Sequence, residues 1–202
     1  MSYDYSENIL VQGAAGDLLH DELGWDLVYA HNQETLGPNG MLGRTDYREV
    51  LLTKYLRPAL FRLNSWMTEA YADSVVKSLL ETSFSATPMQ TNELKYRLIT
   101  GGVPVDFRLP NGNLEKRLAR VIDFDNPAND HFLAVKEMKI HGTLYHRRAD
   151  IIGFVNGIPL LLIELKKMGV DVREAYDNNY HDYQHTIPQL FRFNAFVMLS
   201  NG

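Results

Sequence analysis

The stretch ADIIGFVNGIPLLLIEL, residues 149 to 165, decides the fold. Two runs of β-branched or apolar residues flank Asn156-Gly157, and this pair between such runs is the signal of a tight β-hairpin. The second run, residues 158 to 165, is apolar on both faces, which is typical of a strand buried in the middle of a sheet. We therefore predict a hairpin whose second strand is central.

Charged residues at the end of this apolar run predict a site. Glu164 and Lys166 lie on the same face of the strand by alternation, where unpaired buried charges would be costly. Counting back from the turn, Asp150 falls opposite Ile163 or its neighbour. Two carboxylates and a lysine at one place can form an oxygen site for Mg²⁺: Asp150 and Glu164 hold the metal, and Lys166 orients a water molecule or stabilises the transition state. A purely structural salt bridge between Glu164 and Lys166 is the alternative.

The rest of the chain combines helical and strand-like patterns. Apolar spacing and stop signals predict helices over residues 7–23, 46–63, 66–82, 90–99 and 172–186. Asp46 and Glu49 resemble a capping box that opens the second of these helices. Further strands are expected over residues 103–109, 118–124, 132–140 and 195–199, the first two forming a hairpin around PNGN. This order predicts an α/β fold with helices against a sheet.

Composition narrows the class of protein. A chain of 202 residues with 45% hydrophobic residues can bury one sizeable core. Cysteine is absent, which excludes disulfides and thiolate metal sites and suits a reducing cytoplasm. The first residues lack the pattern of a signal peptide, and no apolar run has the length of a membrane span, so we expect a cytoplasmic protein without a membrane partner.

Charge is distributed unevenly along the chain. The formal net charge is -5, which does not by itself indicate nucleic-acid binding. Residues 131–173, however, carry seven Lys or Arg against four acids, so this segment is +3 and the remainder -8. A phosphate-bearing partner is therefore plausible near the predicted site, although an ordinary solvated face has the same pattern.

Four stretches carry a resemblance to a known family. They are GGVPVDFRLPNG (101–112), VIDFDNPANDHFLAVKEMKI (121–140), RRADIIGFVNGIPLLLIELKK (147–167) and EAYDNNYHDYQHTIPQLFRFNAFVMLSNG (174–202). They resemble the amino-terminal domain of the restriction subunit of type I restriction-modification enzymes, whose nuclease core belongs to the PD-(D/E)xK superfamily. The resemblance implies a mixed β-sheet flanked by helices, with a mainly helical portion over residues 1–100 and the nuclease core over 101–202.

The resemblance also implies roles for individual residues. Asp150 and Glu164 match the metal ligands and Lys166 the catalytic lysine. Tyr183 matches the tyrosine of a glutamine-tyrosine motif implicated in DNA handling, although an aromatic side chain on an amphipathic helix can equally pack on the sheet. Asn179 stands where the family has glutamine and has one methylene less reach. Arg148 and Lys167 flank the core, where they can meet DNA phosphates or keep a sheet edge soluble. The superfamily often uses an acid on the first helix; Glu7 is the candidate, although it would also favour the helix dipole.

The whole enzyme that this resemblance implies is larger than the chain. ATP-dependent motor domains would follow residue 202, and modification and specificity subunits would be partners. The enzyme would use Mg²⁺, ATP and S-adenosylmethionine and cut unmodified double-stranded DNA after translocation. Two alternatives stay open: a non-catalytic DNA-binding or assembly module on a nuclease fold, and a stand-alone repair or junction nuclease of the same superfamily.

Overall fold

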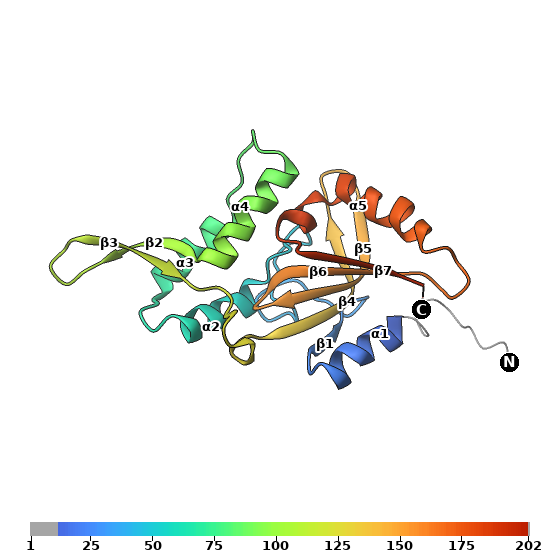
Figure 1. Cartoon of the computed structure of the whole chain (residues 1–202), viewed down its shortest axis with the longest axis horizontal. Coiled ribbons are helices and arrows are strands. Elements are labelled where there is room, and N and C mark those ends of the chain that lie inside the picture. Colours follow the sequence, from blue (N-terminus) through green and yellow to red (C-terminus); the bar gives the residue numbers. More distant parts are fainter. Residues whose placement is uncertain (1–11, 202) are drawn as a thin grey trace.

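A mixed sheet forms the centre of the protein in a computed structural model that describes residues 12–201 (Figure 1). The sheet has five strands in the order β1-β4-β5-β6-β7. The strands are β1 (Asp26–Tyr29), β4 (Phe132–His141), β5 (His146–Val155), β6 (Ile158–Leu165) and β7 (Phe196–Ser200). Both edge strands run parallel to their neighbours, whereas β4, β5 and β6 are antiparallel. The predicted α/β fold is confirmed, and β6 is an inner strand as expected.

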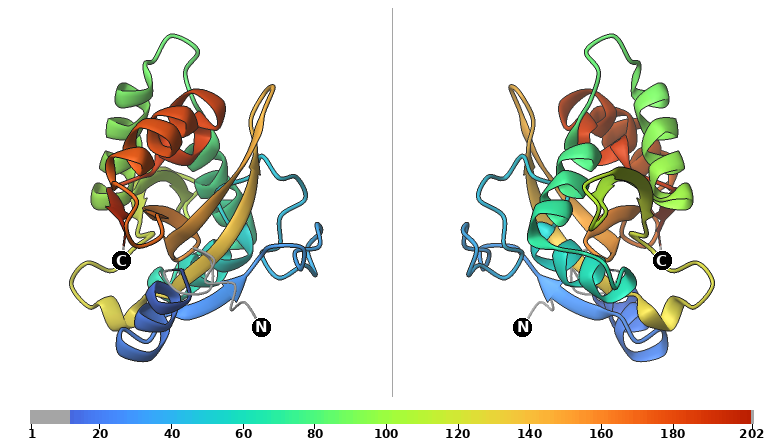
Figure 2. Two further views of the ribbon diagram at one scale, coloured as in Figure 1. Left: turned by 90° about the vertical axis from the view of Figure 1, so that its right-hand side faces the viewer. Right: turned by 90° about the vertical axis from the view of Figure 1, so that its left-hand side faces the viewer.

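Helical segments cover both faces of this sheet. On one face lie α1 (Gly13–Asp17) and the π-helical turn that continues it (Leu18–Glu22). On the other lie a π-helical segment (Ala175–Tyr180), α5 (His181–Thr186) and a 3-10 turn (Pro188–Arg192). A further 3-10 turn (Pro127–Asn129) precedes β4 along the chain. Figure 1 and Figure 2 show α1 and α5 on opposite sides of the strands. Each face therefore has its own apolar cluster, in which Leu19 packs with Ile151 and Ile163 and Tyr183 packs with Leu162.

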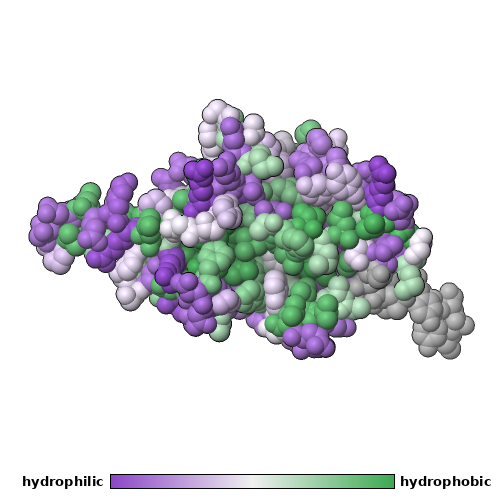
Figure 3. Space-filling view, in the orientation of Figure 1, coloured by the Kyte–Doolittle hydropathy of each residue, from purple (hydrophilic) through white to green (hydrophobic). Residues whose placement is uncertain are grey.

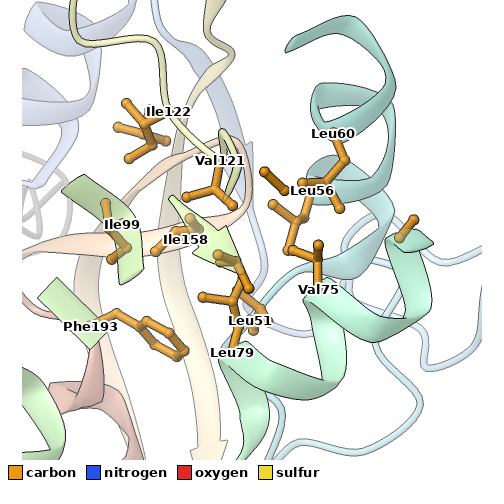
Figure 4. Packing of buried hydrophobic residues seen from close by; sticks show 14 of the residues in the cluster. Leu51, Leu56, Leu60, Val75, Leu79, Ile99, Val121, Ile122, Ile158 and Phe193 are labelled. Carbon is orange, nitrogen blue, oxygen red and sulfur yellow. The ribbon is translucent and has the colours of Figure 1, made fainter. Parts of the chain in front are cut away.

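The remaining elements form a lobe beside the sheet. This lobe contains α2 (Thr53–Leu63), α3 (Glu69–Leu80), α4 (Pro88–Gly101) and the hairpin of β2 (Val103–Arg108) with β3 (Leu114–Ala119). The hairpin projects away from the sheet in Figure 1, and hydrophilic residues cover most of it in Figure 3. Leu56, Leu60, Val75 and Leu79 meet Ile158 beside the turn of the β5–β6 hairpin (Figure 4). One core therefore joins the lobe to the sheet.

The β5–β6 turn has the predicted conformation. Asn156 has φ 49° and Gly157 has φ 79°, as a tight turn that follows the twist of the strands requires. A Cβ on Gly157 would lie 2.3 Å from the backbone oxygen of Leu52, whose N–H donates to the Gly157 oxygen at 2.8 Å. Glycine at this position therefore permits both the positive φ of the turn and the close packing of the segment before α2.

Two sequence predictions need correction, and one strand was missed. The helix expected from Asp46 begins at Thr53, because Val50, Leu51 and Leu52 are all buried and a helix with one apolar face cannot bury three consecutive residues. The second strand of the β2–β3 hairpin is 114–119 rather than 118–124. The turn over 110–113 is tight and places Arg108 opposite Leu114. Strand β1 was not predicted, since its four residues carry too short a pattern.

Two of the three helices of the lobe, α3 and α4, agree better with their sequence signals. Thr68 caps α3 by accepting a hydrogen bond from the Tyr71 N–H. Thr87 and Gln90 form a capping box at the start of α4, and Gly102 with φ 87° ends that helix. None of the helices in residues 12–201 is long and apolar enough to cross a membrane.

Candidate active site at the fork between strands β5 and β6

The sheet divides at Asp150 and Glu164. Pairing of β5 with β6 starts at the turn with Val155 opposite Ile158 and shifts by one residue at an irregularity between Gly153 and Phe154. The last pair is Ile151 with Ile163. Beyond it β5 continues along β4 to His146, while β6 continues along β7 to Leu165. The shift therefore places Asp150 opposite Glu164. The count from the turn predicts Ile163 or its neighbour at this position, and Glu164 is that neighbour.

Hydrogen bonds hold the two carboxylates across this fork. The Asp150 N–H donates to Glu164 Oε1 at 3.2 Å. Asp150 Oδ2 accepts from the Leu165 N–H at 2.8 Å, and Glu164 Oε2 accepts from Asn179 Nδ2 at 3.0 Å. The divergence of the strands leaves backbone N–H groups without ladder partners, and the carboxylates satisfy them. Both acids are thus fixed in orientation by donors from β5, β6 and the following helix.

Glu164 is in an unfavourable environment for a negative charge. Its side chain is 0% exposed. Burial raises the pKa of Glu164 well above its usual range, the nearby Asp150 charge raises it further, and the Lys166 charge acts in the opposite direction. A paired, buried carboxylate with a raised pKa is typical of a functional site, where a cation or a proton supplies the compensating charge.

Lys166 and Lys167 follow directly after β6. The Lys166 N–H donates to the Ser200 oxygen at 2.8 Å, so the end of β7 fixes its backbone. Lys166 is partly buried and its charge acts on Glu164, whereas Lys167 is exposed. The predicted lysine therefore lies at the site, and its neighbour faces solvent.

Asn179 and Tyr183 lie one helical turn apart on the segment that covers Glu164. Asn179 Nδ2 is 3.4 Å from the Tyr183 hydroxyl, which donates to the Arg148 backbone oxygen at 3.0 Å. Tyr183 is only 4% exposed, and burial followed by the Glu164 charge raises its pKa. This burial leaves little of Tyr183 for the DNA contact that we expected. The tyrosine instead lies beneath the site and links it to β5.

Arg148 points into a polar cleft beside the fork. Its guanidinium lies 3.7 Å from Glu137 and 2.6 Å from the His31 ring, and its side chain is 49% exposed. Glu137 is buried in β4 with φ 53°, a strained conformation for this residue type. The cleft has a volume of about 510 Å³. Its charged and ring-bearing lining residues are His31, Glu34, Tyr47, Glu137, Lys139, His146, Arg147 and Arg148.

The sequence analysis missed Gln12. This side chain is 4% exposed, and its Nε2 donates to Asp150 Oδ1 at 2.7 Å. Within residues 12–201 its Oε1 is buried without a hydrogen-bond partner, which costs about 1–3 kcal/mol. The available signal was a polar residue on the apolar helix face that contains Ala15 and Leu19. Glu7, the acid predicted for this helix, lies outside the described residues.

The donor set at the fork suits a hard cation. In the described part of the chain, no group of three or more His, Cys, Asp or Glu side chains is placed to hold a metal ion. Asp150 and Glu164 provide two carboxylates, and Mg²⁺ usually takes only one or two from a protein, with water and substrate phosphate completing its shell. The orphaned Gln12 oxygen beside them fits the same ion.

A mixed sheet flanked by helices, with paired carboxylates and a lysine where two central strands part, has the architecture of a restriction-endonuclease-like nuclease fold. Residues 4–202 match the family described as type I restriction enzyme R protein N terminus. The chain belongs to this family.

Named relatives agree with this membership. The chain is 33% identical, over 89% of its length, to the endonuclease subunit of the type I restriction enzyme HindI of Haemophilus influenzae. It is 28% identical, over 98% of its length, to a Methanocaldococcus jannaschii protein provisionally named as the endonuclease subunit of the type I restriction enzyme MjaIXP. The matches span 17% and 19% of those two proteins, so the chain covers less than a fifth of their length.

Proposed function

We propose that this chain is the DNA-cleaving domain of a type I restriction enzyme and hydrolyses phosphodiester bonds of unmodified double-stranded DNA with Mg²⁺. The observation that carries the proposal is the meeting of Asp150 and Glu164 at the fork, with Lys166 next to them. Two carboxylates whose orientations are held by backbone and amide donors are a prepared site for one small cation. The names of the relatives as endonuclease subunits support the reaction class.

Asp150 and Glu164 would hold the ion. When bound, Mg²⁺ supplies a water of lowered pKa and neutralises charge that develops on the phosphate. The Leu165 N–H and Gln12 Nε2 orient the Asp150 carboxylate, and Asn179 orients that of Glu164. Because burial raises the pKa of Glu164, a proton competes for this carboxylate whenever the cation is absent.

Lys166 would act on the reacting phosphate. It is only partly buried, so its ammonium group can reach solvent and substrate while its charge also acts on Glu164. In this role it donates a hydrogen bond to the attacking water or to a phosphate oxygen and stabilises the negative charge of the transition state.

Residues around the fork would bind the DNA backbone. Lys167 is exposed directly beyond Lys166, and the half-exposed Arg148 lies at the edge of the polar cleft. Such contacts to phosphates position a duplex without reading its sequence. We therefore assign recognition of the target sequence to a separate specificity subunit.

The whole enzyme needs more than this chain. We propose that it works in the cytoplasm with modification and specificity subunits, with ATP for translocation by motor domains and with S-adenosylmethionine. The length of the relatives, of which this chain covers less than a fifth, leaves room for those motor domains.

The test is cleavage of unmethylated plasmid DNA by the assembled enzyme that carries Lys166→Ala. We expect cleavage to fall at least ~100-fold, the scale of losing one transition-state donor, while ATP hydrolysis persists. Lys116→Ala, at a side chain that is 79% exposed on the β2–β3 hairpin, is the matched control. Undiminished cleavage by the Lys166 variant would favour a non-catalytic DNA-binding or assembly module. Cleavage of junction DNA by this chain alone would favour the stand-alone nuclease.

A further inference from the structure

Gln12 has an unusual position for an uncharged polar side chain. It begins the helical segment that packs on the sheet face of Ile151 and Ile163, and it is 4% exposed. The approach of this segment is close, since a Cβ on Gly16 would lie 3.1 Å from the Lys136 side chain. Apolar side chains alone could pack against this sheet face. Burial of an amide there costs free energy unless both of its polar atoms have polar partners.

The two ends of the Gln12 amide are in different situations. Nε2 donates to Asp150 Oδ1 at 2.7 Å. Oε1 shares its carbon atom with Nε2 and therefore also lies beside the carboxylate, yet it is buried and no donor in the described residues reaches it. Exchanging the two amide atoms would set Oε1 against the Asp150 carboxylate oxygen, so the observed orientation is the favourable one.

The charge around this oxygen favours a cation. Asp150 and Glu164 bring two carboxylates together at the fork, where the Asp150 N–H donates to Glu164 Oε1 at 3.2 Å. Amide carbonyl oxygens are ligands for Mg²⁺ and Mn²⁺. A carbonyl oxygen adds a donor without adding a third negative charge, which would repel the phosphate of the substrate.

We propose that Gln12 Oε1 is a third protein ligand of the cation that Asp150 and Glu164 hold. This inference rests on the proposed function, because it assumes a divalent cation at the fork. It goes beyond that function by bringing the first helix into the metal site through an amide. Gln12 then has two roles: Nε2 orients Asp150, and Oε1 contacts the ion.

The test measures Mn²⁺ binding to this chain by paramagnetic resonance, and counts the water molecules on the bound ion by the relaxation of water protons. Gln12→Leu removes the oxygen and should weaken Mn²⁺ binding by ~10-fold or more. Because water replaces the lost ligand, the bound ion should gain about one water molecule. Gln12→Glu keeps an oxygen there and should retain the wild-type water count. The matched control is Gln33→Leu at an exposed glutamine.

The outcomes separate the two proposals. If wild-type protein binds no Mn²⁺, or if Glu164→Gln binds it as well as wild type, the metal site itself is wrong and the ligand role fails with it. If wild type binds, Glu164→Gln does not, and Gln12→Leu leaves the water count unchanged, only the ligand role of Gln12 is overturned. Gln12 would then act solely by orienting Asp150. Thermal melts of each variant show whether it is folded.

Discussion

Replacement of Glu164 by glutamine should destabilise the metal-free protein at low pH and stabilise it at high pH. Glu164 is 0% exposed, and its pKa is raised well above the ordinary value of 4.5, first by burial and then by Asp150. A raised pKa in the folded state contributes stability that is fully present below the ordinary value and is lost as pH rises through the folded-state value. Metal-free wild type should therefore lose stability over that range, and Glu164→Gln should not.

The hydrogen bonds set the size of the effect at low pH. Glutamine keeps the oxygen that accepts from the Asp150 N–H, but its amide nitrogen then faces Asn179 Nδ2, so one bond is lost. That loss costs about 0.5–1.5 kcal/mol. Near pH 4 the variant should be less stable than wild type by roughly this amount. Once the pH has risen through the raised pKa of Glu164, the carboxylate is charged only in wild type, so the order should reverse.

A cation adds a second difference between the two proteins. Mg²⁺ at a hundred times its dissociation constant stabilises a folded protein by about 2.7 kcal/mol. For a chain of 202 residues this corresponds to a rise of roughly 5–10 °C in melting temperature. Only wild type should show this rise, because Glu164→Gln lacks one of the two carboxylates.

The assay is thermal unfolding of both proteins in a series of buffers from pH 4 upward, with and without Mg²⁺. Groups away from the fork titrate alike in both, so the difference between the two curves isolates Glu164 together with Asp150 and Tyr183, whose charges interact with it. A variant that is less stable than metal-free wild type at every pH would refute the environment assigned to Glu164. An equal Mg²⁺-induced rise in both proteins would refute its role as a ligand.

Two further predictions concern the scaffold of the site. Gly157→Ala should lower the free energy of unfolding in urea by roughly 2–3 kcal/mol, because its Cβ would lie 2.3 Å from the Leu52 oxygen at φ 79°. Gly169→Ala, at φ 88° in open space, should lower it by only about 1–2 kcal/mol. Equal losses in the two variants would contradict this account. Arg44→Met should cost about 3–5 kcal/mol, because Arg44 is 0% exposed and its partner Glu34, at 2.5 Å and 4% exposed, would keep an unpaired charge. The double variant with Glu34→Gln should recover part of the lost free energy of unfolding, because the unpaired charge is removed. If the losses of the two single variants simply add in the double variant, the two side chains are not coupled.

Local sequence signals determined the parts of the fold that depend on near neighbours. The Asn156-Gly157 turn and the apolar pattern of β6 each act within a few residues of the chain, and both are present, whereas the capping box predicted at Asp46 and Glu49 does not open a helix. The presence of Lys166 two residues after Glu164, at the end of a buried strand, follows from the same local pattern. For this reason the hairpin and the region of the site could be predicted before the structure was known.

The tertiary structure decided which groups meet at the site. The irregularity between Gly153 and Phe154 sets Asp150 level with Glu164, and it arises from strand pairing that no single strand encodes. The contact of Gln12 with Asp150 joins residues 138 positions apart, and the burial of Tyr183 depends on which sheet face its helix covers. Periodicity and turn chemistry act along the chain, whereas register and the choice of face depend on contacts between distant segments. The sequence by itself therefore determined the hairpin and its acidic and basic residues, and only the folded chain determined the geometry that brings them together.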